Sequence, residues 1–268
     1  MKLSIVISTQ PTQFNALAYQ GKLKENINNI RSMGYDGVEL AVRDPKLLDL
    51  DLIKELTIKQ DFPVSALGTG QAYGEEGLSF SDPEESIRKQ AIQRIKEQVE
   101  LAAELDAIVI IGLIRGKVQD NVEYEQAEEW VLEALEECAS INPDVDLVVE
   151  PCNRYEANMI NTAEEGIQLV DKLGLDNVGV LLDTFHMNIE EPDILQSFQK
   201  AGSRVFHVHI ADSNRWYPGA GHIDFKAIVN KLESMNYKGF LSAEIMPKPD
   251  VESAAEKTVQ HMEPIIKK

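Results

Sequence analysis

The chain has 268 residues, of which 26 are Lys or Arg and 45 are Asp or Glu, so its formal net charge is −19. Hydrophobic residues make up 43% and charged residues 26%, which is typical of a globular protein and not of a disordered, collagen-like or coiled-coil chain. The negative charge disfavours nucleic acid and anionic membranes as partners, because both attract clustered Lys and Arg.

Features that indicate a cellular compartment are few. Cys138 and Cys152 are too few for a disulfide framework or a zinc knuckle, and they suit a reducing cytoplasm. The first eight residues have one Lys, a short apolar run and no small-residue cleavage site, so they predict a strand and not a signal peptide. No apolar run approaches the ~20 residues that span a bilayer. We therefore expect a cytoplasmic protein with no membrane partner.

Eight short apolar runs recur along the chain, and several are rich in Val and Ile, as in parallel strands that are buried on both faces. The runs are Leu3–Ile7, Gly37–Val42, Pro63–Leu67, Ala107–Ile111, Asp146–Val149, Val178–Leu182, Val205–Ile210 and Phe240–Ala243. Longer amphipathic segments separate them. This alternation predicts repeated βα units.

Several of the intervening segments carry helix signals. Ser81-Asp82-Pro83-Glu84 predicts the start of one helix, and Thr162 and Gly174 predict the two caps of another. Lys267-Lys268 is expected to close the last helix. The predicted helices are Glu85–Leu105, Val122–Ala139, Gly166–Leu173 and one that opens at Asp224-Phe225.

Both an open doubly wound sheet and a closed barrel produce such an alternation. The count of eight and a length near the typical ~250 residues favour a (β/α)₈ barrel. The first run is not followed by Gly-x-Gly-x-x-Gly, the turn that doubly wound folds use for dinucleotides. Gly68-Thr69-Gly70 is either a turn or a loop that lets the backbone approach a ligand. We predict one α/β barrel domain over residues 1–268.

Ionisable residues occupy the ends of the last four runs. Glu150 ends the fifth, Asp183 the sixth, His209 the seventh and Glu244 the eighth. They are spaced by about one βα unit of ~30 residues, so they should converge on the carboxyl-terminal rim of the barrel.

Such groups at the ends of apolar strands are costly unless they are paired or bind a metal ion. A structural role would explain one of them more easily than four in register. Three carboxylates and one imidazole suit Mn²⁺ most, with Mg²⁺ or Co²⁺ as alternatives. The sequence therefore predicts a divalent metal site.

Polar motifs around these residues resemble the sugar isomerase/epimerase superfamily with xylose-isomerase-like TIM barrels, and within it the ketose 3-epimerases that act on D-tagatose or D-psicose. The matching stretches lie in the C-terminal half: Glu150-x-x-Asn153-Arg154-x-Glu156 with Asn161-Thr162 behind it, Asp183-Thr184-Phe185-His186-Met187-Asn188-Ile189-Glu190-Glu191, His207-x-His209, Asn214-Arg215, Pro218-Gly219-x-Gly221 and Glu244.

The resemblance implies a role for each matching residue. Glu150, Asp183, His209 and Glu244 would hold the metal ion, and Glu150 and Glu244 would also be the acid/base pair. Substrate oxygens would be bound by Glu156, His186 and Arg215. Inversion beside a ketone needs a base on each face of the carbon, and two carboxylates can supply it. The resemblance also leaves a homodimer or a homotetramer open.

The fourth run leads into Leu113-Ile114-Arg115-Gly116-Lys117, a basic loop that neutral-ketose epimerases do not usually show. Arg115 could bind the carboxylate of a sugar acid, or could form a surface salt bridge with Glu123 or Glu125. With this basic loop, the segments Ile110-Ile111-Gly112-Leu113 and Gly70-Gln71-Ala72-Tyr73 resemble the 5-keto-L-gluconate epimerase branch. We therefore expect epimerisation between 5-keto-L-gluconate and D-tagaturonate.

Other functions remain open. A neutral ketose 3-epimerase is one alternative, an aldose–ketose isomerase of the hydroxypyruvate isomerase type is a second, and a non-catalytic sugar-binding barrel is a third. An endonuclease of the same barrel class would need further histidines near Gly68 and Gly112, and none is present there. His207 is expected to lie one layer below His209 as a core residue. Cys152 has no base partner that would make it a nucleophile.

Overall fold

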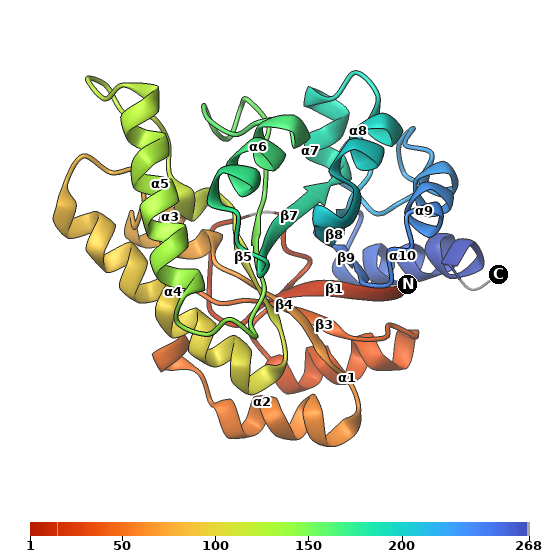
Figure 1. Ribbon diagram of the computed structural model, residues 1–268. Coiled ribbons are helices and arrows are strands. Elements are labelled where there is room, and N and C mark those ends of the chain that lie inside the picture. Colours follow the sequence, from red (N-terminus) through yellow and green to blue (C-terminus); the bar gives the residue numbers. More distant parts are fainter. Residues whose placement is uncertain (15, 267–268) are drawn as a thin grey trace.

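The computed structural model describes residues 1–14 and 16–266, and it shows a parallel barrel surrounded by helices (Figure 1). The strands follow one another around the barrel in chain order, and β1 pairs with β9 to close it. The predicted closure of the last helix by Lys267 and Lys268 lies outside the described residues. The prediction of a (β/α)₈ barrel is confirmed.

Each of the eight predicted apolar runs is a strand. The barrel strands are β1 (Lys2–Ser8), β3 (Val38–Ala41), β4 (Val64–Gly68), β5 (Ile108–Ile111), β6 (Leu147–Val149), β7 (Val178–Asp183), β8 (Val205–Ile210) and β9 (Phe240–Ala243). A two-residue strand that we did not predict, β2 (Tyr19–Gln20), pairs in parallel with the end of β1. It anchors the loop that follows β1.

Helices surround the barrel in Figure 1. Side chains of the strands and helices form one buried hydrophobic cluster. The helices are α1 (Leu23–Met33), α2 (Leu50–Leu56), α3 (Gly70–Glu76), α4 (Glu85–Leu105), α5 (Tyr124–Ala139), α6 (Ala163–Leu173), α7 (Thr184–Glu190), α8 (Ile194–Ala201), α9 (Phe225–Ser234) and α10 (Val251–Ile266). Short 3₁₀ turns connect some of them: η1 (Pro45–Leu47), η2 (Ile58–Gln60), η3 (Leu113–Arg115) and η4 (Gly202–Arg204).

The helix caps follow the sequence signals with one exception. Thr162 and Glu165 form a capping box at the start of α6, and Gly174 ends that helix in the left-handed conformation. Asp224 accepts a hydrogen bond from Ala227 N at the start of α9. The signal at residues 81–84 is different, because Asp82 accepts a hydrogen bond from Glu84 N and forms a turn before α4 begins at Glu85.

The interior of the barrel is divided into two parts. A small apolar cluster of Ala66, Ile110, Val148 and Leu181 fills one side. Polar side chains occupy the other side, where Ser65 Oγ donates to Ser4 Oγ at 3.0 Å. The polar half of the interior lies next to the candidate active site.

Among the described residues, no helix has the length and apolar character needed to cross a membrane.

Candidate active site

Four ionisable side chains meet at the carboxyl ends of neighbouring strands. Glu150 directly follows β6, Asp183 ends β7, His209 lies near the end of β8 and Glu244 directly follows β9. Asp183 and His209 are paired in register across β7 and β8. One potential ligand atom from each of the four residues lies within 4.8 Å of the others. The structure therefore brings together all four residues that we expected to bind metal.

Three atoms of this cluster are buried and have no hydrogen-bond partner in the described part of the chain: Glu150 Oε1, Asp183 Oδ2 and His209 Nδ1. His209 Nδ1 is 3.6 Å from Glu150 Oε1 and 4.0 Å from Asp183 Oδ2, too far for hydrogen bonds. Each unpaired buried polar atom costs about 1–3 kcal/mol. A divalent cation would pair with all three, so this oxygen-rich donor set fits Mn²⁺ or Mg²⁺.

Glu39, on β3, is a member of the site that the sequence analysis missed. Its carboxylate lies 2.9 Å from His207 Nε2, and its two oxygens lie 3.0 and 3.1 Å from His209 Nε2. Burial alone would raise the pKa of Glu39, but His209 and His207 hold it below its usual range. The sequence feature that could have identified Glu39 is its position as a charged residue inside the apolar run Gly37–Val42.

The position of Glu39 determines how His209 faces the cluster. A carboxylate beside Nε2 favours the proton on that nitrogen, which leaves the Nδ1 lone pair directed at Glu150 and Asp183. His207 lies one layer deeper and is buried beside Glu39, as predicted. Glu39 therefore contacts both histidines, and of the two only His209 belongs to the four-residue cluster.

The two glutamates expected as acid and base have different proton affinities. Burial raises the pKa of Glu244 to about 7, although the Arg215 guanidinium opposes this shift. Burial also acts to raise the pKa of Glu150, but His209 and His186 lower it below its usual value. The site thus contains two carboxylates whose environments separate their pKa values, a feature of acid/base pairs.

Arg215 connects Glu244 to Glu156. Its Nη2 donates to Glu244 Oε2 at 2.7 Å and its Nη1 donates to Glu156 Oε1 at 2.7 Å. The guanidinium lies between the rings of Phe14 and Phe185, at 5.3 and 4.8 Å from their centroids. These contacts fix Arg215 at the edge of the site, where it can orient Glu244.

His186 lies on α7, directly after β7. Its Nε2 is 3.8 Å from Glu150 Oε1, and its Nδ1 is 2.7 Å from Asn153 Nδ2. Asn153 also donates to Glu156 Oε1 at 3.1 Å. The three residues expected to bind substrate, Glu156, His186 and Arg215, therefore lie beside the cluster.

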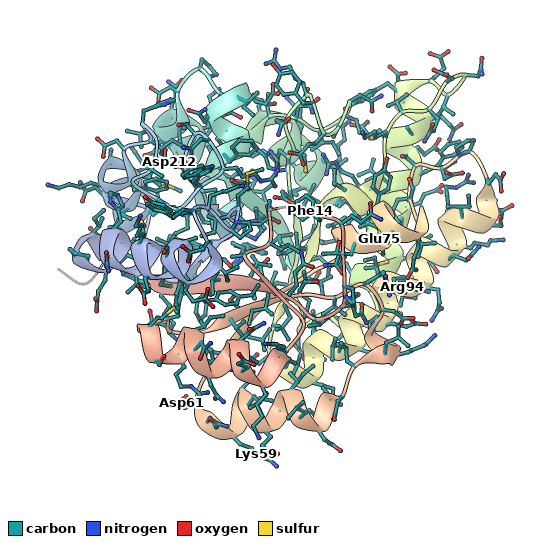
Figure 2. All side chains as sticks on the ribbon, turned by 180° about the vertical axis from the view of Figure 1, so that it is seen from behind. Phe14, Lys59, Asp61, Glu75, Arg94 and Asp212 are labelled. Atoms are coloured by element: carbon teal, nitrogen blue, oxygen red, sulfur yellow. The ribbon has the colours of Figure 1, made fainter. Side chains whose placement is uncertain are left out.

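A cavity of about 260 Å³ opens above these residues. One wall is formed by Glu150, Glu156, His186, His209, Arg215 and Glu244. The opposite wall contains Gly68, Thr69, Gly70 and Gln71, so this segment lines the cavity and is more than a turn. Phe14 and Glu75, labelled in Figure 2, line the mouth. Glu75 accepts hydrogen bonds from Thr12 Oγ1 and Gln13 N.

The structure places Arg115 away from this cavity. Its side chain is completely buried in η3 and donates to the carbonyl oxygens of Gly112, Met159 and Ile160. It is not on the surface, so the expected salt bridge with Glu123 or Glu125 is wrong. It also does not line the cavity, so the expected contact with a substrate carboxylate is not supported. The reason is that the 3₁₀ turn after β5 directs the side chain inward.

Cys152 is buried and lines the cavity two residues after Glu150. Burial raises the pKa of its thiol to about 12, so the thiolate that a nucleophile needs is disfavoured. Its Sγ contacts Arg115 Nη1 at 3.5 Å and the backbone oxygen of Glu150 at 3.5 Å. Cys152 is therefore a packing residue of the loop after β6.

Comparison with known proteins places this geometry in a family. Residues 27–265 match the family described as the xylose isomerase-like TIM barrel, and the chain belongs to it. An L-ribulose 3-epimerase from Mesorhizobium japonicum is 30% identical over 241 residues, which cover 86% of this chain and 78% of the relative.

Two further relatives agree with this placement. A 3-dehydro-D-guloside 4-epimerase from Escherichia coli is 28% identical over 240 residues, covering 85% of this chain and 88% of the relative. The D-psicose 3-epimerase from Clostridium cellulolyticum H10, solved with D-tagatose, has the same fold with a TM-score of 0.85 over 99% of both chains at 24% identity. The named relatives are sugar epimerases, which supports an enzyme of the isomerase class.

Proposed function

We propose that the protein is a divalent-metal-dependent epimerase that inverts the carbon next to the ketone of a keto sugar or keto sugar acid. The observation that carries this proposal is the cluster of Glu150, Asp183, His209 and Glu244, with three buried atoms that lack a hydrogen-bond partner in the described chain. Two of the four are glutamates on strands separated by β7 and β8. The set thus combines metal ligands with two carboxylates that can approach a substrate from different sides.

The four cluster residues would hold the metal ion, with Mn²⁺ as the proposed physiological ion. When bound, a divalent cation would polarise the ketone and its neighbouring hydroxyl and stabilise the charge of the enediolate.

The protein residues account for the proton transfers. One glutamate of the pair Glu150 and Glu244 removes the proton from the carbon next to the ketone, and the other returns a proton to the opposite face. Arg215 holds Glu244 by a 2.7 Å hydrogen bond, so the carboxylate keeps its direction. Glu156 and His186 line the cavity and supply hydrogen-bonding groups to sugar hydroxyls.

For the substrate, we propose the pair 5-keto-L-gluconate and D-tagaturonate. The two segments that carry the resemblance to that branch contribute Gly70, Gln71, Ile110, Gly112 and Leu113 to the cavity wall. These residues line the cavity, and Gly112 lies beside Glu150 of the cluster. They would therefore contact a bound substrate. Arg115 does not line this cavity, so it would not contact the substrate there.

A neutral ketose is the second candidate, because a different observation favours it. The described cavity wall includes five glutamates and one cation, Arg215, which is already paired with Glu156 and Glu244. Such a wall attracts a sugar carboxylate weakly. The relative from Mesorhizobium japonicum is named an L-ribulose 3-epimerase, which also acts on a neutral ketose.

An exchange experiment distinguishes the candidates. The Mn²⁺-loaded enzyme is incubated in D₂O with 5-keto-L-gluconate, D-tagaturonate, D-fructose or D-tagatose and followed by NMR. Deuterium entry with inversion next to the ketone supports epimerisation, and a preference for the acids or for the ketoses identifies the substrate class. Conversion to an aldose would indicate an isomerase. No exchange with metal bound would contradict the proposal and favour a binding protein.

A further inference from the structure

Arg115 is a buried cation whose role the proposed function leaves unexplained. Its side chain has no exposed area. The hydrogen bonds of its guanidinium go to neutral groups: Gly112 O at 2.7 Å, Ile160 O at 3.1 Å, Met159 O at 3.2 Å and Cys152 Sγ at 3.5 Å. Burying a charge with only neutral hydrogen-bond partners destabilises the fold, so we expect Arg115 to have a specific role that compensates for this cost.

These contacts join both ends of one loop. Residues 150–161 follow β6 and contain Glu150, Asn153 and Glu156 of the site. Arg115 contacts Cys152 near the start of the loop and Met159 and Ile160 at its end. A backbone hydrogen bond from Cys152 N to Ile160 O at 3.3 Å closes the same loop. The guanidinium thus lies where the two ends of the loop meet.

The end of the loop needs such a support. Ile160 has a φ of 53°, in the left-handed region that a β-branched residue rarely adopts. A strained residue of this kind persists only when its surroundings hold it. Arg115 donates to the carbonyl of Ile160 itself and to that of the residue before it, so it contacts the backbone at the point of strain.

We propose that Arg115 is a positioning residue that holds the 150–161 loop and thereby places Glu150, Asn153 and Glu156 in the site. Its planar fork of donors reaches three carbonyl oxygens at once. A lysine has the same charge but only one nitrogen, so it cannot replace these contacts. In this role Arg115 acts on the geometry of the loop and does not contact the substrate.

The test compares Arg115→Met and Arg115→Lys with a control, Arg204→Met, which removes an exposed arginine paired with Asp171 on the surface. Three quantities are measured on folded protein: Mn²⁺ affinity by calorimetry, and kcat and KM for the sugar acids and for the neutral ketoses. We expect both Arg115 variants to lose about tenfold in Mn²⁺ affinity and about 100-fold in kcat. We also expect KM to rise for sugar acids and neutral ketoses alike, because the loop carries Glu156, and we expect Arg204→Met to match the natural chain.

Two results would overturn the proposal. Unchanged kcat and Mn²⁺ affinity with only a lower melting temperature would show that Arg115 acts in stability alone. A higher KM for the sugar acids only, with unchanged kcat, would show that it binds a substrate carboxylate. The kinetic part rests on the proposed function, whereas Mn²⁺ affinity does not. If the natural chain turns over none of the four substrates, the proposed function fails and the affinities still test the loop.

If the Arg115 variants do not fold, a variant of another residue tests the same proposal. Asn161 Nδ2 donates to Cys152 O at 2.7 Å and to Ala157 O at 3.0 Å, so it holds the same loop from a less buried position. Asn161→Ala is expected to lower kcat and Mn²⁺ affinity by about tenfold each. Unchanged values would overturn the idea that the closure of this loop places the site residues.

Discussion

The two halves of the barrel contribute differently to the site. Strands β6 to β9 end in the cluster of Glu150, Asp183, His209 and Glu244. The ends of β4 and β5 carry glycines instead, and both Gly68 and Gly112 line the cavity. From the first half, Glu39 contacts the cluster by a hydrogen bond with His209.

This difference shows that the two sets of strands contribute different kinds of residues to the same rim of the barrel. The C-terminal strands carry the four clustered ionisable side chains, and the N-terminal strands contribute glycines to the cavity wall and Glu39 beside His209. Gly112 illustrates the point, because a Cβ atom there would lie 2.5 Å from Glu150 Oε2. The absence of a side chain at Gly112 therefore leaves room for the Glu150 carboxylate. The predictions below test both halves.

The largest effect is expected in the C-terminal half, from Glu244→Gln. The amide cannot exchange the proton that the mechanism needs, so we expect kcat to fall by about 10³-fold. NMR in D₂O measures the loss of exchange, and calorimetry measures Mn²⁺ binding in the same sample. Glu233→Gln, at an exposed position on α9, is the matched control. Retained exchange in Glu244→Gln would assign the proton transfer to other groups.

Gly112→Ala tests the space that the N-terminal half leaves for Glu150. The added methyl group must displace the carboxylate, and a displacement near 1 Å costs about 100-fold in activity. Gly74→Ala is the control for lost cavity volume, because Gly74 also lines the cavity but a Cβ there meets no atom within 4 Å. Equal kcat values for the two variants would show that Glu150 moves aside without loss.

Glu39→Gln tests the support of His209. A carboxylate accepts from both imidazoles, whereas an amide offers one acceptor, so one of the two histidines must change its tautomer. We expect Mn²⁺ affinity to fall about 10- to 100-fold, measured by calorimetry. Ser65→Ala removes a polar group of the barrel interior that bonds to Ser4, and it should leave the affinity unchanged. An unchanged affinity in Glu39→Gln would contradict the support role.

Phe14→Ala is expected to have the smallest effect. Its ring lies 5.3 Å from the Arg215 guanidinium, a contact worth about 1 kcal/mol at a half-exposed position. We expect KM to rise about fivefold with little change in kcat, since Phe14 lines the mouth of the cavity. Phe14→Leu keeps apolar volume without the aromatic face, so recovery in that variant would attribute the effect to volume alone.

The sequence by itself determined the barrel and the four cluster residues. Short apolar runs identify strands, and the parallel strands of a barrel place their carboxyl ends on one rim. Glu150, Asp183, His209 and Glu244 stand at such ends, so their convergence follows from local patterns. The strands and the caps of α6 were predictable for the same reason, because each depends on residues that are near in sequence.

Only the tertiary structure decided which side chains meet across the barrel. Glu39 and His209 are 170 positions apart, and their contact depends on how β3 and β8 face each other across the closed barrel. Arg115 follows a strand just as Glu150 does, yet a 3₁₀ turn directs it into the protein and away from the cavity. A residue's distance along the chain from a strand end is a local property, whereas the direction of its side chain depends on the packing of segments far apart in sequence.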